Sequence, residues 1–320
     1  MAKYCIKKVL QLLVVIILIS FFSFAVIYAA PGDISSMYIN EEMTEEEKEA
    51  VRESLGLNGN LAEQYLGWAK KAVRGDFGIS LANRISVSKQ IIARLPATLQ
   101  LMAASLILSL LIAIPLGLWA GYRKNTWVDH VISGISYVGM SIPSFWFGMV
   151  LIVIFSANLH LLPSSGMHSV GVNSFWDTVK HMIMPCLTLS FSNLAVYIRY
   201  VRSNTIGELG EEYVLAAKAK GTTGRKLLAR HILKNTLLPV ITILGMNLAS
   251  LVCGSFIIES IFGWPGIGTL AMSAIGSRDY PMIMAYVLMS GLILVIGNFV
   301  ADILYAFADP RIKREGPQNG

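Results

Sequence analysis

Long apolar runs alternate with polar segments along this chain. Six runs contain almost no charged side chain: residues 9–30, 97–121, 131–156, 182–198, 237–258 and 282–307. Most reach the roughly 20 residues that an α-helix needs to cross about 30 Å of hydrocarbon, and the run at 182–198 is the shortest. Because backbone N–H and C=O groups in lipid must pair within their own segment, an open chain crosses a membrane as a helix. The pattern predicts an all-α polytopic membrane protein with six transmembrane helices.

Composition agrees with this prediction. The 320 residues are 54% hydrophobic and only 14% charged, whereas soluble domains average about 25% charged residues. An ordinary soluble enzyme is therefore excluded. The first apolar run follows three lysines, as in a signal peptide, but it is longer than the roughly 7–15 apolar residues of such a peptide, and Tyr28 and Pro31 are unfavourable at a cleavage site. We expect residues 1–30 to be retained as an N-terminal segment and first transmembrane helix.

The charged residues indicate how the chain is oriented. Most of the 26 Lys and Arg residues lie in the N-terminal segment and in every second connection after it. The long connection 31–96 holds most of the others, but a segment of that length crosses a membrane largely regardless of charge. The distribution predicts cytoplasmic termini and an extracytoplasmic segment 31–96. The net charge of +6 is then an orientation signal, and we expect membrane lipid but no nucleic acid as a partner.

The extracytoplasmic segment 31–96 carries one clear local signal. Thr44 followed by Glu47 is a capping-box pattern, which predicts a helix that begins there and runs to about Leu55. Acidic and basic residues nearly balance in the segment. It is either a small cap over an external mouth or a solvated connector, and composition favours the connector.

The segment between the fourth and fifth apolar runs is long and basic. Residues 211–221 predict a short helix that ends at Gly221, a residue suited to the left-handed C′ position, and the polar run Ser203–Thr205 can cap its start. A second, basic helix is expected over residues 224–235. The thin, alanine-rich first helix suits close approach by a protein, while a basic interfacial helix suits anionic lipid. These residues alone leave both interpretations open.

A set of motifs makes the chain resemble a known family. Glu212, Ala216, Ala217 and Gly221, followed by Leu238-Pro239, resemble the EAA loop of binding-protein-dependent ABC importers. Further matches follow in order along nearly the whole chain, and the chain most resembles the first permease of the dipeptide/oligopeptide/nickel group. These matches are Gly75-Asp76-Phe77-Gly78-Ile79-Ser80, Arg94-Leu95-Pro96-Ala97-Thr98-Leu99, Ser141-Ile142-Pro143-Ser144-Phe145-Trp146, Leu162-Pro163, Trp264-Pro265-Gly266-Ile267-Gly268, Arg278-Asp279-Tyr280-Pro281 and Asp309-Pro310-Arg311.

The resemblance implies a type I ABC importer permease fold. It divides the chain, after the external segment, into a five-helix permease core at 97–308 that contains a cytoplasmic coupling loop at 203–236, and a cytoplasmic tail at 309–320. In that family the EAA helix docks into a groove of a separate ATPase subunit. The expected ATPase-coupling residues are therefore Glu212, Ala216, Ala217 and Gly221, and structural or gating roles are expected for Gly75, Asp76, Pro143, Trp264, Pro265, Gly266, Asp279 and Asp302.

The resemblance also implies the rest of the transporter. Its partners would be a second homologous permease, two ABC ATPases and an extracytoplasmic substrate-binding protein, in the cytoplasmic (inner) membrane of a prokaryote. This chain has no Walker A sequence, so we expect a non-catalytic subunit without a cofactor, with ATP and Mg²⁺ bound by the partner ATPases. The expected substrates are di- and oligopeptides. A nickel or metallophore importer of the same family is the alternative, because the binding protein sets most of the specificity.

Other functional classes fit the sequence less well. Asp302 is the only carboxylate within the six runs, and it lies near the end of the last one. A structural ion pair or an interfacial hydrogen bond explains it better than a proton relay, and Arg199 or Arg202 is the expected partner. An ion-gradient-driven carrier would need ionisable groups near the midplane. The outer histidines match no metal-ligand spacing and no His-Glu-x-x-His sequence occurs, so we expect neither a metal site nor an intramembrane protease.

Overall fold

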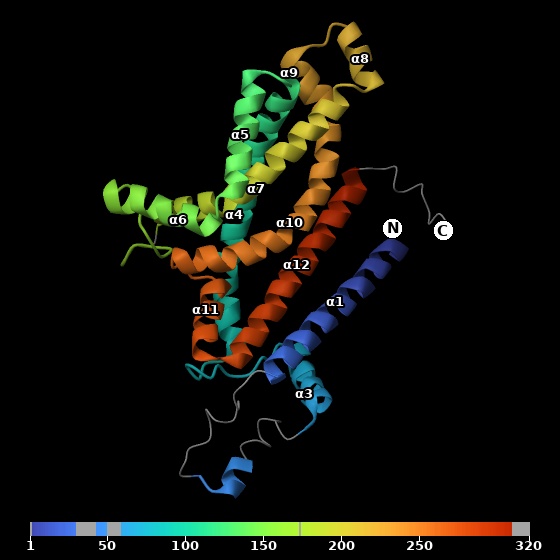
Figure 1. Ribbon diagram of the computed structural model, residues 1–320. Coiled ribbons are helices and arrows are strands. Elements are labelled where there is room, and N and C mark those ends of the chain that lie inside the picture. Colours follow the sequence, from blue (N-terminus) through green and yellow to red (C-terminus); the bar gives the residue numbers. More distant parts are fainter. Residues whose placement is uncertain (1, 30–42, 50–58, 173, 309–320) are drawn as a thin grey trace. The chain divides into compact units, whose positions relative to one another are not determined.

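The computed structural model describes residues 2–29, 43–49, 59–172 and 174–308 (Figure 1). This part of the chain is almost entirely helical, and its β-pairing is limited to a single bridge between Ile79 and Ser86. Contacts divide the chain into two compact units. The first comprises Met1–Pro96 and Gly266–Val295, and the second comprises Ala97–Pro265 and Ile296–Gly320.

The first unit is built from helices that come from both ends of the sequence. An aromatic and polar contact joins α1 to α3: the hydroxyls of Ser20 and Tyr65 lie 2.9 Å apart, and Phe21 packs edge-on against the Tyr65 ring. The unit contains α1 (Ala2–Ala29), α3 (Leu61–Val73), the start of α4 (Val87–Tyr122), α11 (Ile267–Ser277) and most of α12 (Tyr280–Ala308).

One apolar core unites the start of α4 with α11 and α12. Val87 and Ile91 of α4 are almost fully buried and belong to the same cluster as Ile267 of α11 and Met282 of α12. Phe77, from the segment before α4, packs against this cluster. The residues that lead into α4, which are part of the segment predicted to be extracytoplasmic, therefore pack onto the first unit, whereas composition favoured a solvated connector.

The second unit is organised around α7, which packs against α5, α6 and α10. Its helices pack closely because α4 presents small residues to α7. A Cβ atom added to Gly117 or Gly121 would lie 2.6 Å from Val201 or Thr205, respectively, so this G-x-x-x-G pattern allows close approach of the two backbones. The unit contains the rest of α4 and α12, with α5 (Trp127–Ser141), α6 (Ser144–Leu151), η2 (Ile152–Asn158), α7 (Phe175–Glu208), α8 (Glu212–Ala219), α9 (Gly224–Leu227), η3 (Leu228–Ile232) and α10 (Leu233–Ile261).

The helices agree with a multi-pass membrane protein, with one important difference. Within the described residues, four helices are long and apolar enough to cross a membrane, or up to six spans if each of two bent helix pairs counts as one. The predicted span over 131–156 is not one straight helix, because the chain bends by 100° between α5 and α6, as a broken span or a re-entrant loop. Proline disfavours helical backbone in the residue before it, and Ile142 is indeed extended (ψ 124°) ahead of Pro143.

Several helices extend beyond the apolar runs that predicted them. The shortest run, 182–198, lies within the 34-residue helix α7, and α4 begins ten residues before the run at 97–121. Hydropathy marks only the apolar part of a helix, so polar ends are not predicted by it. The Thr44–Glu47 capping box is confirmed, with Glu47 N–H donating to Thr44 Oγ1 at 3.3 Å. The expected end of that helix near Leu55 and the tail 309–320 lie outside the described residues.

Candidate functional site

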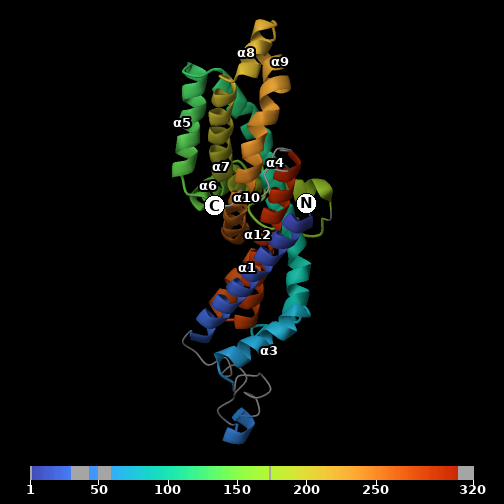
Figure 2. The same ribbon diagram turned by 90° about the vertical axis from the view of Figure 1, so that its right-hand side faces the viewer.

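The loop between α7 and α10 holds the short helix α8 at one end of the second unit (Figures 1 and 2). Gly221 follows the C-cap residue Lys220 with a φ of +84°, which confirms the predicted left-handed turn. Gly221 N–H donates to Lys218 O at 2.8 Å and Thr222 N–H donates to Ala217 O at 3.0 Å, so the last carbonyls of α8 are satisfied by the turn. A Cβ at Gly221 would meet no atom within 4 Å. The glycine is therefore needed for backbone conformation and not for space.

Two faces of α8 have different environments. Val214 and Ala217 are buried in a cluster with Leu227 and Ile232, against which Tyr122 at the end of α4 also packs. The opposite face carries the exposed residues Glu212, Leu215 and Ala216. The four residues expected to couple to an ATPase are therefore divided: Ala217 belongs to the core that holds α8, whereas Glu212, Ala216 and Gly221 are exposed.

A polar cluster connects α8 to both neighbouring long helices. The Tyr213 hydroxyl of α8 donates to Glu208 Oε2 at the end of α7. Asn235 Nδ2 of α10 donates to the Tyr213 hydroxyl at 2.9 Å and to Glu208 Oε2 at 3.3 Å. Burial, reinforced by the Glu208 hydrogen bond, raises the pKa of Tyr213 to about 12. The phenol is therefore protonated at neutral pH and can donate to the carboxylate.

Two local predictions for this loop are wrong. Ser203–Thr205 does not cap α8, because these residues lie inside α7, where Thr205 Oγ1 donates to Val201 O at 2.7 Å. The basic segment 224–235 is not a separate helix, since α9 continues through the π-helical turn η3 into α10. Its four basic residues remain exposed: Arg225, Lys226, Arg230 and Lys234.

In the first unit, two of the sequence motifs meet at Asp279. This carboxylate is 2% exposed and accepts hydrogen bonds from the Ser80 hydroxyl and from Leu81 N–H at 3.1 Å. Gly75 has a φ of +78°, and Asp76 Oδ1 accepts from Gly78 N–H at 2.9 Å, which shapes the turn before Ser80. Gly75-Asp76 and Asp279 therefore belong to one structural feature.

The remaining motif residues lie at helix junctions. Trp264 is fully buried in the second unit, and its indole N–H donates to Ala97 O at 2.9 Å. Pro143 is the N-cap residue of α6, and Gly266 is the N-cap residue of α11. Pro265 lies between Trp264 and Gly266 and is half-buried. Pro143 and Gly266 therefore mark where helices begin, and the structural or gating roles expected of these residues stay predictions.

Asp302 is not the only carboxylate within the helices that follow from the apolar runs. Asp129 of α5 is 1% exposed, and Arg202 of α7 donates to both of its oxygens, with Nη2–Oδ2 at 2.7 Å. Arg202 is therefore not the partner of Asp302, which lies half-buried in α12. Glu259 is also fully buried in α10. Sequence reasoning missed Asp129 and Glu259 because the apolar runs were taken to begin at 131 and to end at 258.

Two of the histidines that were predicted to lie on the outer side approach one carboxylate. His181 Nε2 lies 3.7 Å from Asp177 Oδ1, and His168 Nδ1 lies 3.9 Å from Asp177 Oδ2. His181 Nδ1 also lies 3.1 Å from Ser165 O, so the ring contacts a loop carbonyl. Among the described residues, no group of three His, Cys, Asp or Glu side chains is placed to hold a metal ion.

Comparisons with known proteins agree with the motifs. Residues 113–314 match the family described as binding-protein-dependent transport system inner membrane component, and residues 1–102 match the N-terminal component of such membrane proteins. The chain is 40% identical over 315 residues to the oligopeptide transport system permease protein AppB of Bacillus subtilis (strain 168), covering 98% of this chain and 100% of the relative.

Two relatives from Escherichia coli (strain K12) are similar over nearly the same length. The dipeptide transport system permease protein DppB is 33% identical, with 93% of this chain and 94% of the relative covered. The glutathione transport system permease protein GsiC is 34% identical, with 98% and 99% covered. The chain therefore belongs to the family of inner membrane components of binding-protein-dependent transport systems.

Proposed function

We propose that this chain is a permease subunit of an ATP-driven ABC importer and forms part of the pathway for short peptides. The observation that carries the proposal is the full-length similarity to permeases named for oligopeptide, dipeptide and glutathione transport. The helical membrane architecture and the exposed helix α8 support it. The nickel or metallophore alternative has less support, because these three relatives are all named for peptides.

In this proposal, α8 is the element that contacts an ATPase subunit. Its exposed face offers a carboxylate at Glu212 for a charge-assisted hydrogen bond, beside the small residue Ala216, which lets a partner approach closely. Ala217 supports the helix from inside through the apolar cluster with Leu227 and Ile232. ATP and Mg²⁺ would be bound by two partner ATPases, and this chain would be non-catalytic.

The connections of α8 support a mechanical role for it. Apolar packing joins α8 to η3 and to the end of α4, and the Tyr213 hydroxyl joins it to α7 and α10. Closure of two ATPases would move docked helices together, and a helix tied to its neighbours transmits that movement as a rigid body. The spans would then alternate between inward- and outward-facing states. A second permease and an extracytoplasmic binding protein complete the proposed transporter.

Uptake by a deletion strain tests the substrate class. We expect removal of this chain to abolish uptake of labelled di- and tripeptides, and a plasmid copy to restore it. Uptake of nickel–histidine complexes is measured in parallel. If the deletion abolishes nickel uptake but leaves peptide uptake unchanged, the nickel alternative replaces the peptide proposal. If both uptake rates are unchanged, the proposed function is refuted.

A further inference from the structure

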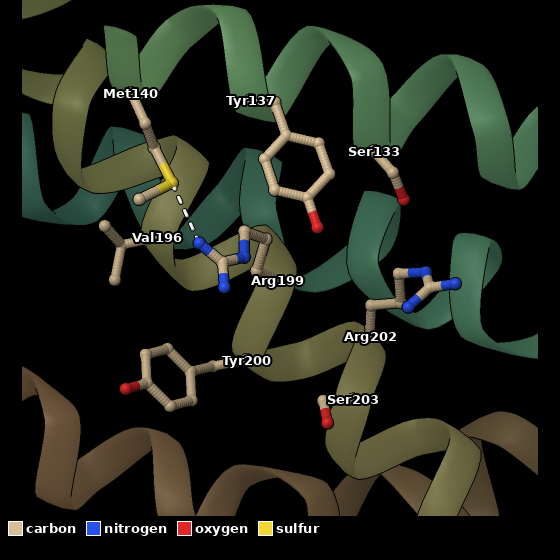
Figure 3. Close-up of a pocket in the computed structure, with 8 residues that line it drawn as sticks. All are labelled: Ser133, Tyr137, Met140, Val196, Arg199, Tyr200, Arg202 and Ser203. Atoms are coloured by element: carbon tan, nitrogen blue, oxygen red, sulfur yellow. Dashed lines mark hydrogen bonds between the residues drawn. The ribbon is translucent and has the colours of Figure 1, made fainter.

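A cavity of about 420 Å³ lies in the second unit between α5 and α7 (Figure 3). The cavity is open on one side, since Tyr137, Met140, Arg199 and Tyr200 are all exposed, and its walls combine polar and apolar side chains. The residues that matter here are Ser133, Tyr137 and Met140 from α5, with Arg199, Tyr200 and Arg202 from α7. The volume is within the range of roughly 300–1,000 Å³ that is usual for small-molecule sites.

The two arginines of this cavity are not equivalent. Arg202 is neutralised by Asp129, which accepts from it with both oxygens. Arg199 contacts the face of the Tyr137 ring, 5.3 Å from its centroid, and its Nη1 lies 3.2 Å from Met140 Sδ. Within the described part of the chain, no carboxylate lies at salt-bridge distance from Arg199. The cavity therefore carries one unmatched positive charge.

The Arg199 side chain does not turn toward the end of α7 where α8 begins. Arg199 lies nine residues before Glu208, the last residue of α7, which corresponds to about 13 Å of helix. Figure 3 shows its guanidinium directed at Met140, which is in the last turn of α5 before the bend at Pro143. The side chain is exposed, and it is held across the opening between α5 and α7 by Met140 and by the ring of Tyr137. Arginines placed in this way face a water-filled cavity or a counter-ion.

The ring of Tyr137 and the sulfur of Met140 hold the guanidinium without neutralising it. A planar guanidinium presents paired N–H donors that match the two oxygens of a carboxylate. Ser133 and Tyr200 also line the cavity. A site on a transport pathway must release its ligand. One bidentate pair beside weakly interacting side chains holds a ligand less tightly than a fully closed site, so it suits such a pathway.

We propose that this cavity is a carboxylate site on the translocation pathway and that Arg199 binds the C-terminal carboxylate of a peptide in transit. This inference rests on the proposed peptide-importer function. Every peptide with an unmodified C-terminus carries this group whatever its side chains are. A site that recognises the terminus alone fits a permease that leaves side-chain selection to a binding protein.

The test uses the complete importer in proteoliposomes, with purified binding protein loaded to saturation. The variants are Arg199→Gln, which removes the charge, and Arg199→Lys, which keeps the charge but loses the paired donors. Arg123→Gln is the control, because it removes an exposed arginine of the same unit outside the cavity. Binding-protein affinity for a peptide and its C-terminal amide is measured first, and a pair that binds equally well is used.

We expect Arg199→Gln to lower uptake of the free-carboxylate peptide at least tenfold and to leave uptake of the amide unchanged. Arg199→Lys should give an intermediate rate and Arg123→Gln the wild-type rate. Equal effects of Arg199→Gln on both peptides would overturn the site. An effect that occurs only when phosphatidylglycerol is present would also overturn the site, because Arg199 would then bind a lipid headgroup. Loss of the second permease on purification of Arg199→Gln would overturn it too, because Arg199 would then belong to a subunit contact.

A second variant separates failure of this site from failure of the proposed function. Gly221→Asp lies in the loop proposed to contact the ATPase. If Gly221→Asp stops peptide uptake while Arg199→Gln transports both peptides normally, the importer function stands and the carboxylate site is refuted. If the wild-type complex transports no peptide, the proposed function itself fails.

Discussion

The carboxylate of Asp279 accepts a hydrogen bond from the hydroxyl of Ser80, although 199 residues separate them in the sequence. Asp279 begins the turn into α12, where its Oδ1 also lies 3.4 Å from Met282 N. Ser80 belongs to the segment that leads into α4. This contact fixes the segment before α4 to the start of α12, and it explains why two distant motifs of the sequence belong together.

We predict that Asp279→Ala destabilises the protein by several kcal/mol. The change leaves the Ser80 hydroxyl and the Leu81 N–H buried without an acceptor, and each such group costs about 1–3 kcal/mol. Asp279→Asn should cost less, because its amide oxygen still accepts. Thermal unfolding of the detergent-solubilised complex measures both. Asp76→Ala is the control, since this exposed carboxylate in the same segment should cost less than Asp279→Ala; equal costs would contradict the role of Asp279.

Gly221→Asp should abolish ATPase stimulation by the loaded binding protein while the complex still assembles. A non-glycine residue at a φ of +84° costs roughly 1–2 kcal/mol, and the new carboxylate adds a charge to the surface proposed to meet the ATPase. Because a Cβ meets no neighbouring atom, α8 should stay folded. Basal and stimulated ATPase rates are compared after copurification.

Gly221→Asn is the matched variant for this prediction, since asparagine tolerates the left-handed region better than most residues and adds no charge. We expect it to retain much of the stimulation. Normal stimulation in the Gly221→Asp complex would refute the assignment of this loop to ATPase coupling.

Tyr213→Phe should weaken the link between ATP hydrolysis and transport without unfolding α8. It removes the hydroxyl that joins α7, α8 and α10 but keeps the ring. We expect fewer peptides transported per ATP, with basal hydrolysis unchanged. Tyr122→Phe is the control, because Tyr122 packs on the same cluster and its hydroxyl makes no hydrogen bond to a described residue. Equal coupling ratios in the two variants would contradict a role for the Tyr213 hydroxyl.

The Tyr213 phenol should not lose its proton in the physiological pH range. Its pKa is raised from about 10 to about 12, so its stabilising contribution is fully present below pH 10 and is lost only as the pH rises through about 12. The coupling ratio of the wild-type complex relative to Tyr213→Phe should therefore be constant between pH 6 and pH 9. A ratio that changes in this interval would point to a different titrating group.

The parts of the fold that depend on residues adjacent in the sequence were predictable. The Gly221 turn and the Thr44–Glu47 cap each follow from a few adjacent residues. The bend at Pro143 had a local signal too, but the apolar run continues through it and hydropathy alone suggested one span. Helix α3 was missed because it is short and amphipathic and has no apolar run.

The contacts that build the site depend on distant residues, so the sequence could not supply them. Tyr213 and Asn235 are 22 residues apart, and Asp129 and Arg202 are 73 apart. The segment 211–221 contains Tyr213 but neither of its partners, Glu208 and Asn235. Ala217 illustrates the same limit: its motif predicts a docking residue, whereas only the packing of α8 shows that it is directed inward.

The Asp129–Arg202 pair gives the last prediction, because its two members are buried to different degrees. The Asp129 side chain is 1% exposed and the Arg202 side chain is 28% exposed. Arg202→Gln would leave a buried, uncompensated carboxylate, which costs about 3–5 kcal/mol, whereas Asp129→Asn would leave an arginine that water can partly solvate. We therefore expect Arg202→Gln to lower the unfolding temperature more than Asp129→Asn does, and the double variant to be more stable than Arg202→Gln alone. Thermal unfolding in detergent measures all three, and additive effects would show that the pair does not stabilise the packing of α5 on α7.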